Sequence, residues 1–257
     1  MGIDLNADVG ESFGAYSLGQ DADLVPLITS ANVACGFHAG DPGVMRATVA
    51  LARHHGVAVG AHPGFPDLLG FGRREMRATP REVEDAVAYQ IGALAGIAAT
   101  EGLRLQHVKA HGALYNMAVR EAPLADAIAK ATASVDRSLI LLGLPGSQLV
   151  LAGRRAGLRT ASEAFADRAY QPNGELVPRS QSGAVIEEAD TVVSRAIMMA
   201  REHVVIAVDG TRVPIDVDTI CVHGDTPGAA ALARRIREAL TQAGVDIAAL
   251  GAAMRMP

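Results

Sequence analysis

Clusters of polar and ionisable residues repeatedly end the apolar runs of this sequence. They occupy residues 4–8, 35–41, 60–64, 107–112, 163–168 and 221–225. A strand of a parallel sheet is covered on both faces and is therefore mostly apolar, and an unpaired charge is costly to bury. Titratable groups at the carboxyl ends of several such strands are typical of an active site at one rim of a barrel. The pattern therefore indicates an enzyme.

Strand and helix patterns alternate along the chain. Strands are expected at 3–8, 28–35, 57–61, 105–110, 139–144, 158–162 and 219–223. Helices are expected at 44–54, 79–97, 124–133, 187–202 and 229–243, the first after Asp41-Pro42 and the second after a capping box at Thr79. With about seven strands in βα units, we expect residues 1–257 to form one catalytic domain, a distorted α/β barrel. A doubly wound open sheet is the alternative, because the pattern leaves closure undecided.

Three segments depart from this alternation. Residues 204–208 and 212–217 flank Asp209-Gly210, which predicts a β-hairpin with a type I′ turn at the edge of the barrel. Residues 63–78 and 164–186 are long connections rich in Gly, Pro and Arg. Because long loops in compact domains are often functional, we expect these two connections to contribute to function.

Bulk composition restricts the partners and the location of the protein. The net charge of -5 and the pI near 5.9 give no basic footprint for nucleic acid. Two cysteines are too few for the disulfide framework of a small secreted domain. The first residues carry no signal-peptide pattern, and no apolar run approaches the ~20 residues that span a bilayer. We therefore expect a cytoplasmic protein with no membrane or nucleic-acid partner.

The first cluster places three polar side chains on one face of a strand. Alternation puts Asp4, Asn6 and Asp8 on the same side. In a barrel this side faces the lumen, where three polar groups exceed what packing requires. Asp8 is therefore a candidate base, and Glu11 lies just beyond the strand. A structural alternative is that Asp8 and Glu11 cap a turn.

His38 and His62 follow the second and third strands at corresponding places. A capping role does not explain His38, so both histidines are functional candidates. Asp41 precedes Pro42 and suits a helix N-cap, with substrate binding as its alternative. Cys35 suits a small buried hydrophobic residue better than a nucleophile.

The fourth strand carries the strongest pattern. Alternation puts His107, Lys109 and His111 on one face. A lysine in a lumen is expensive to bury unless it meets an anion, so we expect Lys109 to hold a carboxylate or phosphate. A purely structural lysine is the alternative. His111 is then a candidate acid or base near its ordinary pKa of about 6.5.

Charged residues on the later segments complete the candidate set. Arg73 offers a guanidinium that suits a carboxylate or phosphate, and a solvated or structural role of the Arg73-Arg74 pair is the alternative. Asp167 and Arg168 follow Glu163 and could form a local ion pair, and Asp225 could cap the last helix.

Several standard cofactor motifs are absent from the sequence. It has no GxxxxGK[ST] P-loop, no GxGxxG after a strand, no GxSxG, no HExxH and no CxxC. A metal site could still form if certain polar residues converged, although their spacing matches no standard zinc motif. Those residues are Asp8, His38, His62 and His223.

Seven motifs, in this order, resemble the LamB/YcsF family. They are Asp4–Ser12, Ser30–Asp41, Gly60–Gly64, Gly70–Arg74, His111–Asn116, Glu163–Arg168 and Cys221–Asp225. The likeness runs from residue 3 to residue 250, with Ala110 standing where the family pattern has Pro. It implies a distorted (β/α) barrel akin to the glycoside hydrolase and deacetylase superfamily.

The same resemblance implies an activity and partners. The activity is ATP-dependent hydrolysis of 5-oxo-L-proline to L-glutamate, with 5-oxoprolinase subunits B and C as partners. ATP acts as a co-substrate with Mg²⁺, and no tightly bound cofactor is expected. The catalytic candidates are Asp8, His38, His62, Lys109 and His111. The substrate-binding candidates are Asn6, Asn32, Asp41, Arg73, Tyr115, Glu163, Asp167, Arg168, His223 and Asp225.

Other functions remain open from the sequence. A stand-alone metal-dependent deacetylase or amidohydrolase acting on carbohydrate is the main alternative, by analogy of fold. A non-catalytic scaffold protein is another, although the dense inward polar groups argue against it. A homo-oligomer is compatible with each of these functions.

Overall fold

Seven parallel strands close into a barrel. The computed structural model describes residues 2–179, 181–223 and 228–253, without the side chains of His223 and Ala253. The barrel strands are β1 (Gly2–Val9), β2 (Ser30–Ala34), β3 (Ala58–His62), β4 (His107–Val108), β5 (Ile140–Gly143), β6 (Arg159–Phe165) and β9 (Thr219–His223). Closure follows because β1 pairs with β2 on one side and with β9 on the other. The distorted barrel is confirmed, and the open-sheet alternative is excluded.

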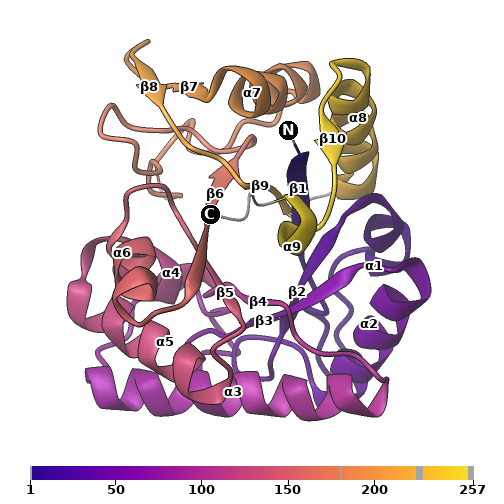
Figure 1. The fold of residues 1–257 in the computed structure, drawn as a ribbon, viewed down its shortest axis with the longest axis vertical. Helices are drawn as coiled ribbons and strands as arrows, with labels where there is room; N and C mark the ends of the chain where they lie inside the picture. The colour runs from indigo at the N-terminus through magenta and orange to yellow at the C-terminus, as the bar shows by residue number, and fades with distance from the viewer. Residues whose placement is uncertain (1, 180, 224–227, 254–257) are drawn as a thin grey trace.

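Helices surround the strands (Figure 1). They are α1 (Asp21–Leu24), α2 (Pro42–His55), α3 (Pro80–Thr100), α4 (Gly112–Arg120), α5 (Ala122–Val135), α6 (Gln148–Arg155), α7 (Ala189–Glu202), α8 (Ala229–Gln242) and α9 (Leu250–Ala253), with a 3₁₀ turn at Val25–Leu27. The predicted caps are confirmed: Asp41 accepts from two backbone N–H groups of α2, and Thr79 forms a capping box with Glu82. Among the described helices, none has the length and apolar composition to cross a bilayer.

All seven predicted strands are present, and β4 is the most altered. It spans two residues where six were expected. The backbone nevertheless follows β3 further, because the N–H groups of Lys109 and His111 donate to the carbonyls of Ala61 and Pro63. A short unpredicted strand, β10 (Asp246–Ile247), also pairs with β1.

The predicted hairpin is present, but its turn differs. β7 (Val204–Ile206) and β8 (Arg212–Pro214) form a separate antiparallel sheet. Ala207 and Thr211 close the loop through a backbone hydrogen bond, and Gly210 has a φ of 87°. A type I′ turn needs positive φ at both central residues. Asp209 is not in that region, so the prediction was wrong and the loop has three residues with a glycine bulge.

A hydrogen-bonded polar layer fills the middle of the barrel. The amide of Asn32 donates to Asn6 Oδ1 at 2.7 Å and to Asp8 Oδ1 at 2.9 Å. His107 Nε2 lies 2.8 Å from Asn32 Oδ1. Gly60 makes room for this contact, because a Cβ there would lie 2.1 Å from the His107 ring. The layer holds Asp8 at the carboxyl end of β1.

Asp4 lies deeper in the same lumen, and its burial predicts that the stability of the folded protein depends on pH. Burial raises its pKa to about 6, against the opposing effect of hydroxyl donors on Ser30, Thr219 and Thr29. The Asp4 carboxyl group therefore binds a proton more tightly in the folded protein than in the unfolded chain, and this protonation stabilises the folded state. The stabilisation is fully present below the pKa of Asp4 in the unfolded chain and is lost as the pH rises through about 6.

Asp4→Asn should remove this dependence. From about pH 4.5 to about pH 7, wild-type stability relative to the variant should fall by about 2 kcal/mol. Urea unfolding of both proteins across this range measures the difference. A difference that stays constant with pH would show that Asp4 does not titrate there.

Candidate active site

A cavity of about 390 Å³ opens at the carboxyl ends of the strands. The floor includes Asp8 from β1, His62 from β3 and Lys109 after β4. The two long loops predicted from the sequence supply much of the wall, including Arg73 and Arg168. The volume lies within the range of small-molecule sites.

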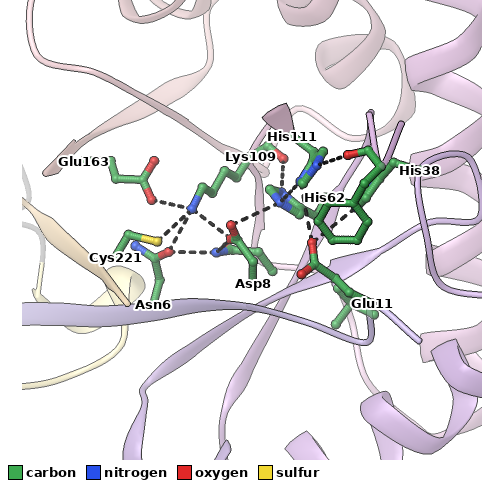
Figure 2. Close-up of polar contacts among 12 residues, drawn as sticks. Asn6, Asp8, Glu11, His38, His62, Lys109, His111, Glu163 and Cys221 are labelled. Atoms are coloured by element: carbon green, nitrogen blue, oxygen red, sulfur yellow. Dashed lines mark hydrogen bonds and ion pairs between the residues drawn. The ribbon is translucent and has the colours of Figure 1, made fainter. Parts of the chain in front are cut away.

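The ammonium of Lys109 contacts several polar side chains at once (Figure 2). It is 2.8 Å from Asp8 Oδ1 and 2.8 Å from Glu163 Oε1. Cys221 Sγ at 3.1 Å and Asn6 Oδ1 at 3.3 Å complete its surroundings. Burial disfavours the charge, but the neighbouring carboxylate of Asp8, with Cys221 and Glu163, outweighs it and holds the pKa of Lys109 well above its usual value.

This arrangement corrects the expected role of Lys109. We expected its charge to hold an anionic ligand, but two carboxylates of the protein itself already flank it. One ammonium between two carboxylates leaves a net negative group. Lys109 therefore neutralises and positions Asp8 and Glu163, and anion binding needs other cations.

His62 connects Asp8 to a group of histidines. Its Nε2 lies 3.4 Å from Asp8 Oδ2 and 2.9 Å from His111 Nδ1. Its Nδ1 lies 2.7 Å from the carbonyl of Lys109, and His111 Nε2 lies 2.8 Å from the carbonyl of Phe71. Carbonyls only accept hydrogen bonds, so these contacts fix the protonated nitrogen on each ring.

Glu11 and His38 lie behind these two rings. His38 stacks on His111 with ring centroids 3.7 Å apart, and its Nε2 is 3.4 Å from Glu11 Oε1. Burial, with neighbouring histidines, lowers the pKa of both His38 and His111 well below the usual value. Both rings are therefore neutral near pH 7. One ligand atom each from Glu11, His38, His62 and His111 lies within 4.8 Å of the others, so these four could hold a metal.

Arginines provide the positive charge that Lys109 does not offer. Arg73, Arg168 and Arg179 all line the cavity. Arg168 is held by the carbonyls of Val177 and Ala184, to which its Nη2 and Nε donate at 2.6 and 3.1 Å. Burial, with Arg179 nearby, lowers its pKa to about 10, so it stays charged at neutral pH.

The structure brings most predicted residues to one place. Asp8, His62, Lys109, His111, Arg73, Tyr115 and Arg168 line the cavity. Glu163 reaches the site through Lys109, and Asn6 and Asn32 support Asp8 from below.

Other predicted residues lie elsewhere. Asp41 is outside the cavity, because its carboxylate caps α2 and also accepts from Gly14 N–H. His38 is fully buried and does not reach the cavity, and Asp167 lies beside Arg168 without lining it. The His223 side chain and Asp225 lie outside the described residues.

Glu11 and Cys221 were not among the predicted site residues. Glu11 and His111 join His38 and His62 in the group that could hold a metal, whereas Asp8, which was expected in it, lies 3.4 Å from His62 but is not part of the group. Cys221 contacts Lys109, whereas Cys35 is a buried thiol whose pKa burial raises to about 12, as expected of a packing residue. The position of Glu11 three residues past Asp8 was visible, but its direction depended on the loop that follows β1.

Known proteins resemble this chain over nearly its whole length. The sequence profile of the LamB/YcsF family matches residues 3–255. A relative from Bacillus subtilis (strain 168), named as the A subunit of 5-oxoprolinase, is 57% identical over 248 residues, covering 96% of this chain and 96% of that protein. The crystal structure of the lactam utilization protein from Thermus thermophilus has a TM-score of 0.93 and 52% identity, covering 97% of this chain and 100% of that chain.

A more distant likeness concerns the fold alone. The catalytic domain of peptidoglycan N-acetylglucosamine deacetylase from Eubacterium rectale ATCC 33656 has a TM-score of 0.54 at 12% identity, covering 99% of this chain and 90% of that chain. The expected likeness to deacetylase barrels is thus confirmed for the fold. The resemblance seen in the seven motifs is confirmed by the profile match and by relatives that share more than half of their residues. This chain therefore belongs to the LamB/YcsF family.

Proposed function

We propose that this chain is the A subunit of an ATP-dependent 5-oxoprolinase, a hydrolase that converts 5-oxo-L-proline to L-glutamate. The observation that carries the proposal is the 57% identity, over 96% of both chains, to a protein named as the A subunit of 5-oxoprolinase. The cavity is compatible with this substrate, because it joins cationic walls to a carboxylate and a histidine on its floor. We treat residues 1–257 as one catalytic domain.

The chemistry sets clear demands on the site. A five-membered lactam is a stable amide, and phosphorylating its carbonyl oxygen would make the carbon electrophilic. In that route one water adds to the carbon, the C–N bond breaks, and a second water releases inorganic phosphate. The site must therefore hold a carboxylate and a phosphate, and it must accept a proton from water. Arg73, Arg168 and Arg179 suit the two anions, because guanidinium groups bind both in bidentate fashion.

Asp8 is the proposed proton acceptor. It lines the cavity, and its Oδ2 lies 3.4 Å from His62 Nε2. Lys109 holds the other oxygen of Asp8, and with Asn32 it fixes the direction of the carboxylate. Such a positioned base typically contributes about 10²–10⁴-fold to the rate. Lys109 is a positioning residue in this scheme.

ATP enters the proposal through the partner proteins. The sequence has no P-loop, so we assign nucleotide binding, with Mg²⁺, to subunits B and C or to their interface with this chain. The deacetylase alternative rests on a likeness of fold at 12% identity, and a shared fold is not evidence for a shared activity. A scaffold role would leave the buried Lys109–Asp8–Glu163 group without a purpose, at the cost of burying it.

Reconstitution tests the proposal. The pure chain should release little or no glutamate from 5-oxoproline, with or without ATP. Adding subunits B and C with ATP and Mg²⁺ should give ATP-dependent glutamate release that requires all three proteins. Robust activity of the chain alone, or full activity of B and C without it, would contradict the proposal.

A further inference from the structure

Four side chains from four separate segments converge beside the cavity. Glu11 follows β1, His38 follows β2, His62 ends β3 and His111 precedes α4. All four are buried, with 6%, 0%, 1% and 4% of their surface exposed. A ligand atom of each lies within 4.8 Å of the other three. Three imidazole nitrogens and one carboxylate oxygen form a set that binds Zn²⁺ and similar divalent transition metals.

The separations within the group match a small coordination shell. His38 Nε2 lies 3.4 Å, and His111 Nδ1 3.6 Å, from Glu11 Oε1. His62 Nε2 and His111 Nδ1 are 2.9 Å apart. Ligand atoms about 2.1 Å from a tetrahedral zinc are about 3.4 Å from one another. Little movement would therefore bring these atoms onto one ion.

The contact between His62 and His111 requires a positive charge. The other nitrogen of each ring lies against a backbone carbonyl, so His62 Nδ1 and His111 Nε2 carry their protons. In neutral rings the remaining nitrogens, His62 Nε2 and His111 Nδ1, then present lone pairs to each other at 2.9 Å. Lone pairs at that distance repel unless a proton or a metal ion lies beside both.

His38 gives a second, independent observation. It is fully buried, and neither of its ring nitrogens makes a hydrogen bond among the described residues. Buried polar atoms without a hydrogen bond are rare in native proteins and call for an explanation such as an ion. His38 Nε2 is directed toward Glu11, within the group.

The surroundings hold the group in place. A Cβ at Gly72 would lie 2.8 Å from His38 Cβ and 2.9 Å from His111 Cδ2, and a Cβ at Gly64 would lie 2.8 Å from His38 Nδ1. The backbone can therefore pack directly on the rings only because these residues are glycines. Metal-binding histidines usually donate a hydrogen bond from the ring nitrogen that does not face the metal, often to a backbone carbonyl. The contacts of His62 Nδ1 and His111 Nε2 with backbone carbonyls fit this pattern.

We propose that Glu11, His38, His62 and His111 bind one divalent transition-metal ion, with Zn²⁺ as the best match. His62 and His111 line the cavity, so the ion would lie at its edge, next to Asp8. The proposal goes beyond the proposed function and does not rest on it. The competing explanation is a proton shared by His62 and His111.

Metal binding can be measured without any activity. The full chain is treated with a chelator, dialysed, and loaded with Zn²⁺ or Co²⁺. We expect about one ion per chain by elemental analysis, a visible Co²⁺ absorption band typical of nitrogen and oxygen ligands, and a rise in the melting temperature on loading. A folded chain that binds no stoichiometric Zn²⁺ or Co²⁺ would overturn the proposal in favour of the shared proton.

Two variants locate the ion. His38→Gln and Glu11→Gln should each weaken Zn²⁺ affinity at least about 10-fold and alter the Co²⁺ spectrum. His54→Gln is the matched control, because His54 is exposed on the last turn of α2 and should bind as wild type does. Circular dichroism checks the fold, and Glu11→Gln provides the test if His38→Gln does not fold. Wild-type affinity in both variants would place the ion elsewhere and refute the site.

The two proposals can fail separately. A chain that binds zinc at these four residues but gives no 5-oxoproline hydrolysis with its partners would refute the function and keep the site. A chain that supports hydrolysis after full removal of metal, and rebinds none, would refute the site and keep the function.

Discussion

Replacing Lys109 by Met should lower turnover of the assembled complex at least about 10²-fold. The substitution keeps much of the apolar stem but removes the ammonium that lies 2.8 Å from both Asp8 and Glu163. It should also lower the free energy of unfolding by about 3–5 kcal/mol, since removing one partner leaves buried charge uncompensated. Glutamate release at saturating 5-oxoproline and thermal melting measure the two effects.

Two controls separate catalysis from stability. Lys130→Met makes the same change at an exposed site on α5 and should alter neither turnover nor melting. Lys109→Met combined with Glu163→Gln restores the original net charge of the group, so it should recover part of the stability without recovering turnover. If Lys109→Met turns over at a near-normal rate, Lys109 does not position the catalytic carboxylate.

Asp8→Asn should also reduce turnover at least about 10²-fold. The Asp8 carboxylate lies between Lys109 and His62 in Figure 2, and it reaches the cavity. An amide of the same shape cannot accept a proton, and it can present an N–H to the ammonium of Lys109 or to His62. The loss should fall on kcat more than on KM, because the proposed substrate anions bind the arginines.

Asp4→Asn is the matched control for this variant. Asp4 lies on the same face of β1 and is buried more deeply than Asp8, and it does not line the cavity. The Asp4→Asn variant should keep most of the wild-type turnover while showing the altered pH dependence of stability described above. Equal losses in both variants would indicate a general disturbance of the polar layer instead of a specific role for Asp8.

Local sequence patterns were sufficient for the elements of the fold. The seven strands and the caps at Asp41 and Thr79 were predicted because apolar runs and capping residues act within a few positions of the chain. The predicted type I′ turn at Asp209-Gly210 was wrong because loops of several lengths accept the same dipeptide. Pairing of Ala207 with Thr211 selected a three-residue loop. Closure was likewise beyond local patterns, since it requires β1 to pair with β9, more than 200 residues away.

The candidate site, like the fold, was predictable from local sequence patterns only in part. Alternation alone established that Asp4, Asn6 and Asp8 share a face, because the period of a strand fixes where its side chains point. The sequence also identified the family, and with it the residues worth testing. It did not establish that Lys109 is neutralised by Asp8 and Glu163, which lie on strands β1 and β6.

Only the tertiary structure decided which polar groups meet and what each can bind. His38 and His62 were expected to converge with Asp8. Asp8 does lie 3.4 Å from His62, but the loop after β1 and the start of α4 also bring Glu11 and His111 to the two histidines. Side-chain type and spacing determine the chemistry that a residue offers. Its partner is determined by the packing of distant segments, because charge and hydrogen-bond interactions are strong only over a few ångströms.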